Sequence, residues 1–291
     1  MAHYPFCLAW NWEHDAGFVA VLEEAGRALG LPPFQVTPAN LDEVLDALNR
    51  GDLSFHTLLD RAADVDERFL ALADWARAHG LHCLNRYEAA RRAWDKVAMH
   101  HTLRAALHTP PTISLPPYAA QPEIPLLDTR PLGGSFTIKP AHGGGGEGVV
   151  LGATSLEEVQ AARRAQPEEH FLLQGYVVPA EVAGRPAWFR VLYCTGQPFP
   201  CWWDTQTHLY APVTPQEEAR YGLNLLQAIA AAIAHYSEMD LFSSEIALVP
   251  DGRFIVVDYV NDPLDLRLQS QTPEGVPDAI VRAIAERLLT C

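Results

Sequence analysis

Lysine is nearly absent from this acidic sequence. Of the 21 basic residues only two are lysines, Lys96 and Lys139, while the acidic residues number 36 and the formal net charge is −15 at pH 7. So acidic a chain lacks the cationic surface that sequence-independent nucleic-acid binding needs, and we expect no nucleic-acid partner. Arginine does not replace lysine everywhere, because the lysine ammonium is a compact charge on a flexible stem. The positions of the two lysines are therefore informative.

Cysteines and long hydrophobic runs are also scarce. The five cysteines are scattered and form no CxxC pair, which favours reduced thiols over a disulfide framework. No apolar run approaches the roughly 18 residues of a membrane-spanning helix. The first residues lack a basic segment followed by a hydrophobic one, so we read no secretory signal there. We expect a cytoplasmic protein without a membrane partner.

The remaining composition is that of a globular protein, with 48% hydrophobic and 20% charged residues in a chain of 291. This length suggests two domains or one large one. In residues 1–95, short apolar segments alternate with segments of helical periodicity, which predicts a small parallel α/β domain. The expected strands are 6–10, 34–37, 53–59 and 81–84, and the expected helices are 16–29, 41–48 and 66–79.

Residues 96–291 predict a second α/β unit. A long helix is expected over 87–107, and the proline-containing stretch 114–131 reads as a loop. The further expected helices are 155–166, 216–235 and 276–289, the first of them opened by a capping box of Ser155 and Glu158. The expected strands are 135–139, 149–151, 171–178, 187–194 and 198–203, with a hairpin at 243–249 and 254–260.

A glycine-rich loop follows Lys139. Its residues are Gly143, Gly144, Gly145, Gly146, Glu147 and Gly148. Unshielded backbone N–H groups in such a loop can fold over phosphates. The lysine precedes the glycines, and a strand rather than a helix follows them, so the segment is neither a Walker loop nor a dinucleotide fingerprint. Strand, lysine, glycine loop and strand describe a hairpin flap, with an ordinary surface turn as the alternative.

The hairpin near residue 250 predicts a pair of opposed carboxylates. If Asp251 and Gly252 form a two-residue turn, Glu245 lies directly opposite Asp258. Like charges there are destabilising unless a cation neutralises them. Mg²⁺ binds a few carboxylates together with substrate phosphates. The alternatives are one protonated carboxyl group or a solvated strand end.

Taken in order, these motifs resemble the ATP-grasp superfamily, in particular ligases of the glutathione synthetase and ribosomal-protein glutamate ligase type. The resemblance covers about residues 85–265 and implies a two-lobed ATP-grasp unit after the N-terminal domain. The small lobe would be about 110–178, the large lobe about 179–291, with ATP between them. The two lysines, Lys96 and Lys139, fall on the family's two nucleotide-lysine positions.

The resemblance also implies roles for other residues. Gln174, Tyr176 and Val177 lie in the segment that reads adenine, and Glu181 is a candidate for the ribose hydroxyls. Glu245, Asp258 and Asn261 would hold Mg²⁺ or Mn²⁺. Family members commonly end this strand carboxylate-x-Asn, whereas here Asn261 comes one residue later. Asn261 therefore needs a bulge to be re-aimed, and Asp262 is the substitute. Arg190 and Arg267 are the candidates for the phosphate or acyl phosphate, and each could instead be a surface ion-pair residue.

The leading hypothesis is an ATP- and Mg²⁺-dependent ligase. It would activate the carboxylate of a small molecule or peptide as an acyl phosphate and join it to an amine or similar nucleophile. The alternatives are an ATP-dependent kinase acting on a small polyol and a nucleotide-binding regulator without turnover. A homodimer is one assembly that the resemblance allows.

Overall fold

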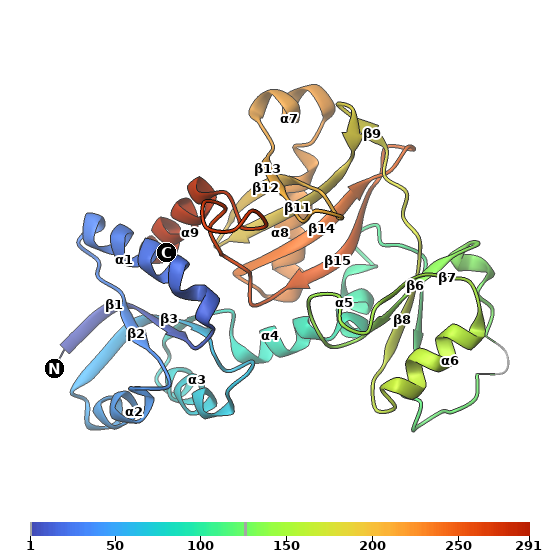
Figure 1. The fold of residues 1–291 in the computed structure, drawn as a ribbon. Coiled ribbons are helices and arrows are strands. Elements are labelled where there is room, and N and C mark those ends of the chain that lie inside the picture. The colour runs from blue at the N-terminus through green and yellow to red at the C-terminus, as the bar shows by residue number, and fades with distance from the viewer. Residues whose placement is uncertain (1, 125–126) are drawn as a thin grey trace.

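Four parallel strands form the first sheet of the computed structural model, which describes residues 2–124 and 127–291. The strand order is β2-β1-β3-β4, with helices on both faces (Figure 1). The predicted α/β architecture of this region is confirmed. Its strands are β1 (Ala2–Trp10), β2 (Phe34–Val36), β3 (Leu53–Arg61) and β4 (His82–Leu84), and its helices are α1 (Ala16–Leu29), α2 (Leu41–Arg50) and α3 (Leu70–Ala78), with short 3₁₀ turns at Glu13–Asp15 and Glu67–Phe69.

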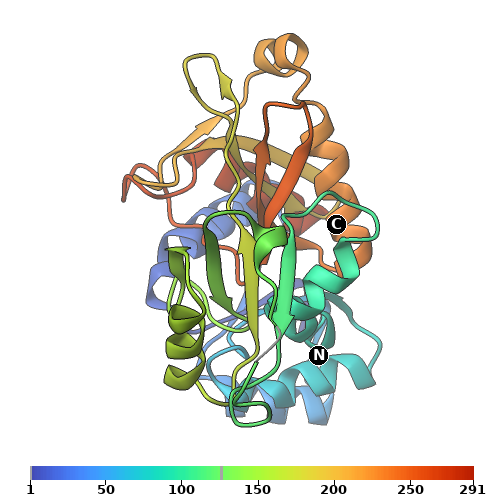
Figure 2. The same ribbon diagram turned by 90° about the vertical axis from the view of Figure 1, so that its right-hand side faces the viewer.

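The second sheet is antiparallel, in the order β5-β8-β6-β7, and falls within the range predicted for the small lobe. Figure 2 shows it from the side of α6 (Leu156–Ala165). Phe136, Ile138, Phe171 and Leu173 build its core against that helix. The sequence analysis missed one strand of this sheet, the edge strand β5, whose last residues lie in the stretch 114–131 that was expected to be a loop. The strands are β5 (Thr112–Leu115), β6 (Phe136–Pro140), β7 (Val150–Ala153) and β8 (Phe171–Gly175), and a 3₁₀ turn covers Arg130–Leu132.

The range predicted for the large lobe contains an antiparallel sheet in the order β13-β12-β11-β14-β15. Helix α8 packs against it through Leu226, Ala230 and Ile233. The expected helix 216–235 is interrupted at Gly222, which has a left-handed φ of 68°. The strands are β9 (Glu181–Val182), β10 (Arg185–Pro186), β11 (Trp188–Cys194), β12 (Gln197–Trp203), β13 (Tyr210–Pro212), β14 (Leu241–Leu248) and β15 (Phe254–Asn261), and the helices are α7 (Pro215–Tyr221), α8 (Leu225–Ser237) and α9 (Asp278–Thr290).

Two helices rather than the single expected one connect the N-terminal domain to the lobes. They are α4 (Tyr87–Trp94) and α5 (Lys96–Leu103). Asp95 between them has extended dihedrals, and its side chain accepts hydrogen bonds from the backbone N–H groups of Val97 and Ala98. An aspartate in this conformation ends one helix and caps the next. The break places Lys96 in the first turn of α5.

The N-terminal domain shares a hydrophobic core with the end of the chain. Phe18 and Leu22 of α1 pack with Ile284 and Leu288 of α9, and the two helices lie side by side in Figure 1. The predicted boundary at residue 95 falls at the break between α4 and α5 and stays a prediction. No helix in the described part of the chain is long and apolar enough to cross a membrane.

The hairpin of β14 and β15 differs from its predicted form. The backbone N–H of Gly252 donates to the oxygen of Val249, and Leu248 pairs with Phe254, so the loop is longer than the expected two residues. A β-bulge then shifts the register, because Ile246 pairs with Val256 whereas Glu245 pairs with Asp258. The turn prediction was wrong, but the bulge restores the predicted opposition of the two carboxylates.

Candidate functional site

Lys139 joins the two lobes at the bulge of β15. Its side chain leaves β6 of the small lobe, and its Nζ donates to the backbone oxygen of Val257 at 3.2 Å. Val257 is the residue that the bulge adds to β15 before Asp258. A bulged residue drops out of the regular ladder of hydrogen bonds, so its carbonyl can accept from a side chain. The ammonium of Lys139 therefore lies beside the proposed metal strand.

Lys96 approaches the same place from α5. Its Nζ donates to the backbone oxygen of Gly143, and its backbone N–H donates to Ala141 at 2.9 Å. Burial lowers the pKa of Lys96, and the charge of Asp258 opposes that shift while Lys139 adds to it. The two lysines and Asp258 are thus close enough to sense one another's charge. The structure brings together residues that the sequence places far apart.

The glycine loop covers this group of charges. Residues 142–148 are exposed, and Gly143, Gly145, Gly146 and Gly148 have positive φ values between 61° and 106°. A Cβ atom at any position from 143 to 146 would meet no heavy atom of the described chain within 4 Å. His142 holds the base of the loop through Nδ1, which lies 3.1 Å from Glu169. The loop therefore offers uncovered backbone above Lys96, as a phosphate cradle requires.

The carboxylates lie on the neighbouring sheet. Glu245 pairs with Asp258 across the strands, and its carboxylate lies 3.3 Å from the guanidinium of Arg190. Burial raises the pKa of Glu245, with Asp258 adding to the rise and Arg190 opposing it. A second register shift lets Asn261 pair with Ser243, two residues before Glu245 on β14. Directly paired residues point to one face, so Asp258 and Asn261 share a face despite their irregular spacing.

The substitute ligand Asp262 has other partners. Its carboxylate accepts hydrogen bonds from Asn85 at 2.7 Å and from Trp94 at 3.0 Å. Burial raises its pKa to about 6. These contacts tie the end of β15 to the segment before α4. Nδ2 of Asn261 donates to the backbone oxygen of Ser243 at 3.2 Å. Because Asn261 shares a face with Asp258, it is better placed than Asp262 to serve as a metal ligand.

This set of residues suits a cation that also binds phosphate oxygens. No group of three or more His, Cys, Asp and Glu side chains suited to a metal occurs in the described ranges 2–124 and 127–291. Two carboxylates and one amide are too few for a closed protein site. Mg²⁺ is commonly bound by one or two carboxylates, with waters and phosphates completing its shell. The donors therefore fit Mg²⁺ bound together with a nucleotide.

A buried glutamine lies at the proposed adenine end. Gln174 of β8 donates from Nε2 to the hydroxyl oxygen of Tyr259 at 2.8 Å, while its Oε1 is buried without a hydrogen-bond partner in the described chain. A buried acceptor without a donor is costly, and an amino group such as that of adenine would satisfy it. Tyr176 is 63% exposed and Val177 is half-buried just beyond. Glu181 is exposed on β9, in a separate two-stranded sheet.

The two candidate arginines have different surroundings. Arg190 contacts Glu245 and Ser243, and its guanidinium lies 4.9 Å from the ring centre of Trp203. Two nitrogens of the Arg267 guanidinium donate to the carboxylate of Asp265, at distances of 2.7 to 3.1 Å. The sequence analysis missed Trp203, because only the pairing of β11 with β12 brings it near Arg190.

Comparisons with known proteins were made for the whole chain. No family model and no curated protein matches the sequence. Among solved structures, a RimK domain ATP-grasp protein from Sphaerobacter thermophilus is similar at 22% identity and a TM-score of 0.62, over 97% of this chain and 99% of that one. The macrocyclase MdnC from Microcystis aeruginosa, bound with its precursor peptide MdnA, is similar at 14% identity and a TM-score of 0.64. The match covers 98% of this chain and 99% of that one.

A third similar structure is the D-alanine–D-alanine ligase from Bacillus anthracis complexed with ATP. It has 12% identity and a TM-score of 0.64, over 99% of this chain and 95% of that one. Similarity along nearly the whole length of both chains shows a shared fold. The protein therefore has the ATP-grasp fold that its motifs indicated.

Proposed function

We propose that this protein is an ATP-dependent ligase that joins a carboxylate to an amine. The observation that carries the proposal is the meeting of both lysines of the chain with Asp258 beneath the glycine loop. Phosphoryl transfer needs cations around the β- and γ-phosphates and little covalent chemistry from the protein. The acidic chain places its two lysines at this one location, which supports a nucleotide site.

In the proposed complex, adenine lies against Gln174, Tyr176 and Val177, with Glu181 directed to the ribose. Lys96, Lys139 and the backbone of residues 143–148 bind the phosphates. Glu245, Asp258 and Asn261 would hold Mg²⁺ or Mn²⁺, which supplies charge neutralisation for the phosphates. The register of the small sheet supports this order. Gln174 on β8 pairs with Thr137 on β6, two residues before Lys139, so the adenine and phosphate contacts lie along one face of that sheet.

The reaction then has two steps. An oxygen of the substrate carboxylate attacks the γ-phosphorus, the bond to the β,γ-bridging oxygen breaks, and ADP leaves. The amine nitrogen next attacks the carbonyl carbon of the acyl phosphate, which expels phosphate as the nitrogen loses a proton. Arg190 is proposed to bind the acyl phosphate, because a planar guanidinium grips such an anion with two hydrogen bonds. Arg267 is the second candidate for this task.

The substrate class follows from what similar proteins bind. The Bacillus anthracis structure contains ATP, and that of the ATP-grasp ligase PsnB contains a minimal precursor, Mg and ADP. We propose a small molecule or a peptide as the carboxylate substrate of this chain. We further propose a cytoplasmic location, in line with its five cysteines, for none of which a disulfide is recorded, and a homodimer as an assembly to be tested.

The experiment is a measurement of ADP release by the purified chain with pooled carboxylates and amines. Hydroxylamine, added in place of the amine, traps an acyl phosphate as a hydroxamate. ADP release with hydroxamate formation supports the ligase. ADP release with a phosphorylated alcohol and no hydroxamate would instead identify a kinase. ATP binding without ADP release across all pools would identify a regulator.

A further inference from the structure

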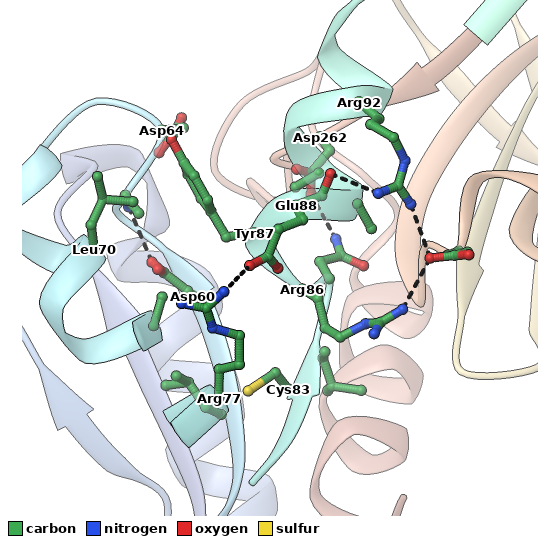
Figure 3. A pocket seen from close by; sticks show the side chains of 18 of the residues that line it. Asp60, Asp64, Leu70, Arg77, Cys83, Arg86, Tyr87, Glu88, Arg92 and Asp262 are labelled. Atoms are coloured by element: carbon green, nitrogen blue, oxygen red, sulfur yellow. Dashed lines mark hydrogen bonds and ion pairs between the residues drawn. The ribbon is translucent and has the colours of Figure 1, made fainter. Parts of the chain in front are cut away.

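A cavity outside the proposed nucleotide site lies between α3 and α4. It has a volume of about 440 Å³ and opens where β3 and β4 end (Figure 3). Within the described chain, neither lysine, none of the loop glycines and neither candidate arginine lines it. Its size is that of a small-molecule site. Its occupant can be argued from the charges that line it.

The arginines of this cavity are already neutralised. Arg77 pairs with Asp74 at 2.7 Å and with Glu88 at 3.1 Å. Arg86 and Arg92 both pair with Glu238, at 3.0 and 2.9 Å, and Figure 3 shows this shared contact. No arginine of the lining is therefore left to attract an anion. Acidic side chains outnumber basic ones among the lining residues, so the formal charge of the cavity wall is negative.

Asp60, at the end of β3, has one carboxylate oxygen that lacks a hydrogen-bond donor in the described part of the chain. Its Oδ1 accepts from the backbone N–H groups of Ala62 and Ala63, at 2.9 and 3.1 Å. Its Oδ2 is buried and has no hydrogen-bond partner in the described ranges. Burial raises the pKa of Asp60 to about 6, and the nearby charge of Asp64 adds to the rise. At neutral pH the group is still mainly ionised, so a cationic donor beside Oδ2 would be strongly favoured.

One part of the wall is apolar. Leu58, Leu70 and Tyr87 line the cavity together with Ala73 of α3. A ligand that matches both the carboxylate of Asp60 and the apolar part of the wall carries a positive charge at one end and a hydrocarbon or aromatic body at the other. We propose that this cavity binds a small primary amine, with its ammonium on Asp60 and its apolar body between α3 and α4.

This site does not depend on the proposed function. Binding is measured without nucleotide, so a failed ligase assay would leave it standing, and failed binding would leave the ligase proposal standing. The amine could be one that the protein consumes or one that only binds. Mass spectrometry of the probe after incubation with ATP, Mg²⁺ and the pooled carboxylates distinguishes these sources, since only an amine that is joined to a carboxylate changes mass.

The test uses the full chain and two matched probes, 2-phenylethylammonium and its neutral isostere 2-phenylethanol. Affinities are measured by calorimetric titration for the wild type, Asp60→Asn, Ala73→Phe and Asp46→Asn. Asp60→Asn keeps the Oδ1 acceptor and removes the charge, whereas Ala73→Phe fills the cavity from α3. Asp46 is exposed on α2 and serves as the control.

We expect the ammonium probe to bind the wild type and Asp46→Asn equally, and to bind Asp60→Asn and Ala73→Phe at least about tenfold more weakly. The neutral probe should bind the wild type more weakly by a similar factor. Equal binding of both probes would overturn the proposal, as would unchanged affinity in Asp60→Asn. The absence of wild-type binding at millimolar probe would overturn it as well.

Discussion

The hydroxyl of Tyr259 lies 2.7 Å from Nδ1 of His100. Burial lowers the pKa of His100 to about 4, so its imidazole is neutral near pH 7. We assign the tautomer in which Nδ1 accepts a hydrogen bond from the hydroxyl. The same hydroxyl oxygen accepts from Gln174 at 2.8 Å. One tyrosine beside Asp258 thus connects α5, the small lobe and the large lobe.

Removing this hydroxyl should destabilise the protein. Tyr259→Phe leaves Nε2 of Gln174 without its acceptor and Nδ1 of His100 without its donor, and each unsatisfied buried group costs about 1–3 kcal/mol. We expect the free energy of unfolding in urea to fall by at least about 1 kcal/mol. Tyr236→Phe on α8, where the side chain is 46% exposed, is the control. Equal losses in the two variants would show that the hydroxyl of Tyr259 has no special role.

His100 also predicts a pH dependence of stability. The folded-state pKa of about 4 lies below the ordinary histidine pKa of about 6.5, so between these pH values the unfolded chain binds a proton that the folded chain does not. The contribution of neutral His100 to the free energy of unfolding is therefore fully present above about pH 6.5. It is lost as the pH falls towards about 4, which lowers the free energy of unfolding by up to about 3 kcal/mol.

His100→Gln keeps an acceptor for Tyr259 and should make the stability loss between pH 7.5 and 5 smaller than in the wild type. Urea unfolding at both pH values measures the difference. His101→Gln, at the exposed neighbouring position, should behave as the wild type. A His100→Gln variant with the full wild-type loss would contradict the assignment.

Lys139→Ala should weaken ATP binding. Loss of a charged hydrogen-bond donor costs about 1.5–3 kcal/mol, and calorimetric titration with ATP and Mg²⁺ measures it. Arg164→Ala removes an exposed cation from α6 of the same lobe and is the matched control. Unchanged affinity in Lys139→Ala would remove the lysine from the nucleotide site.

Asp258→Asn should abolish Mg²⁺-dependent ATP turnover while the protein still folds. The substitution removes a proposed metal ligand and also the like charge opposite Glu245, so the apoprotein should not lose stability for that reason. ADP release over a Mg²⁺ series measures the first effect, and thermal unfolding measures the second. Asp251→Asn, in the exposed hairpin loop, is the control. Normal turnover at limiting Mg²⁺ would show that the carboxylate pair is structural.

Arg190→Lys should lower turnover strongly and leave ATP affinity nearly unchanged. The substitution keeps the charge but loses the planar fork and its stacking on Trp203. An effect confined to turnover assigns the side chain to the acyl-phosphate side of the reaction. Arg253→Lys, an exposed pair with Asp251, is the control. Full turnover in both Arg190→Lys and Arg267→Lys would favour the kinase alternative.

Local patterns in the sequence predicted much of the fold. Alternating strands and helices gave the parallel sheet, and the capping box at Ser155 is present. The break at Asp95 was missed, because helical periodicity continues through it and only the capping geometry separates α4 from α5. The edge strand β5 was missed because it forms by pairing with β8, from far along the chain.

The candidate site was predictable where residue type was decisive. The two lysines of an acidic chain and the pair of opposed carboxylates predicted a phosphate and metal site from residue type alone, and the structure brings Lys96, Lys139 and Asp258 close together. The bulge at Val257, which brings Glu245 opposite Asp258, was not predictable, and neither was the second register shift that pairs Asn261 with Ser243. Nor was the buried role of Tyr259, since its partners come from two other elements.

The packing of α1 against α9 has a consequence for the growing chain on the ribosome. The apolar side of α1 is synthesised well before the residues that cover it, which lie between Ile280 and Leu288. Until then Phe18 and Leu22 lack their partners, and exposed apolar surface of this kind invites chaperone binding or aggregation. The α/β domain that contains α1 is therefore translated before α9 and completed only after it.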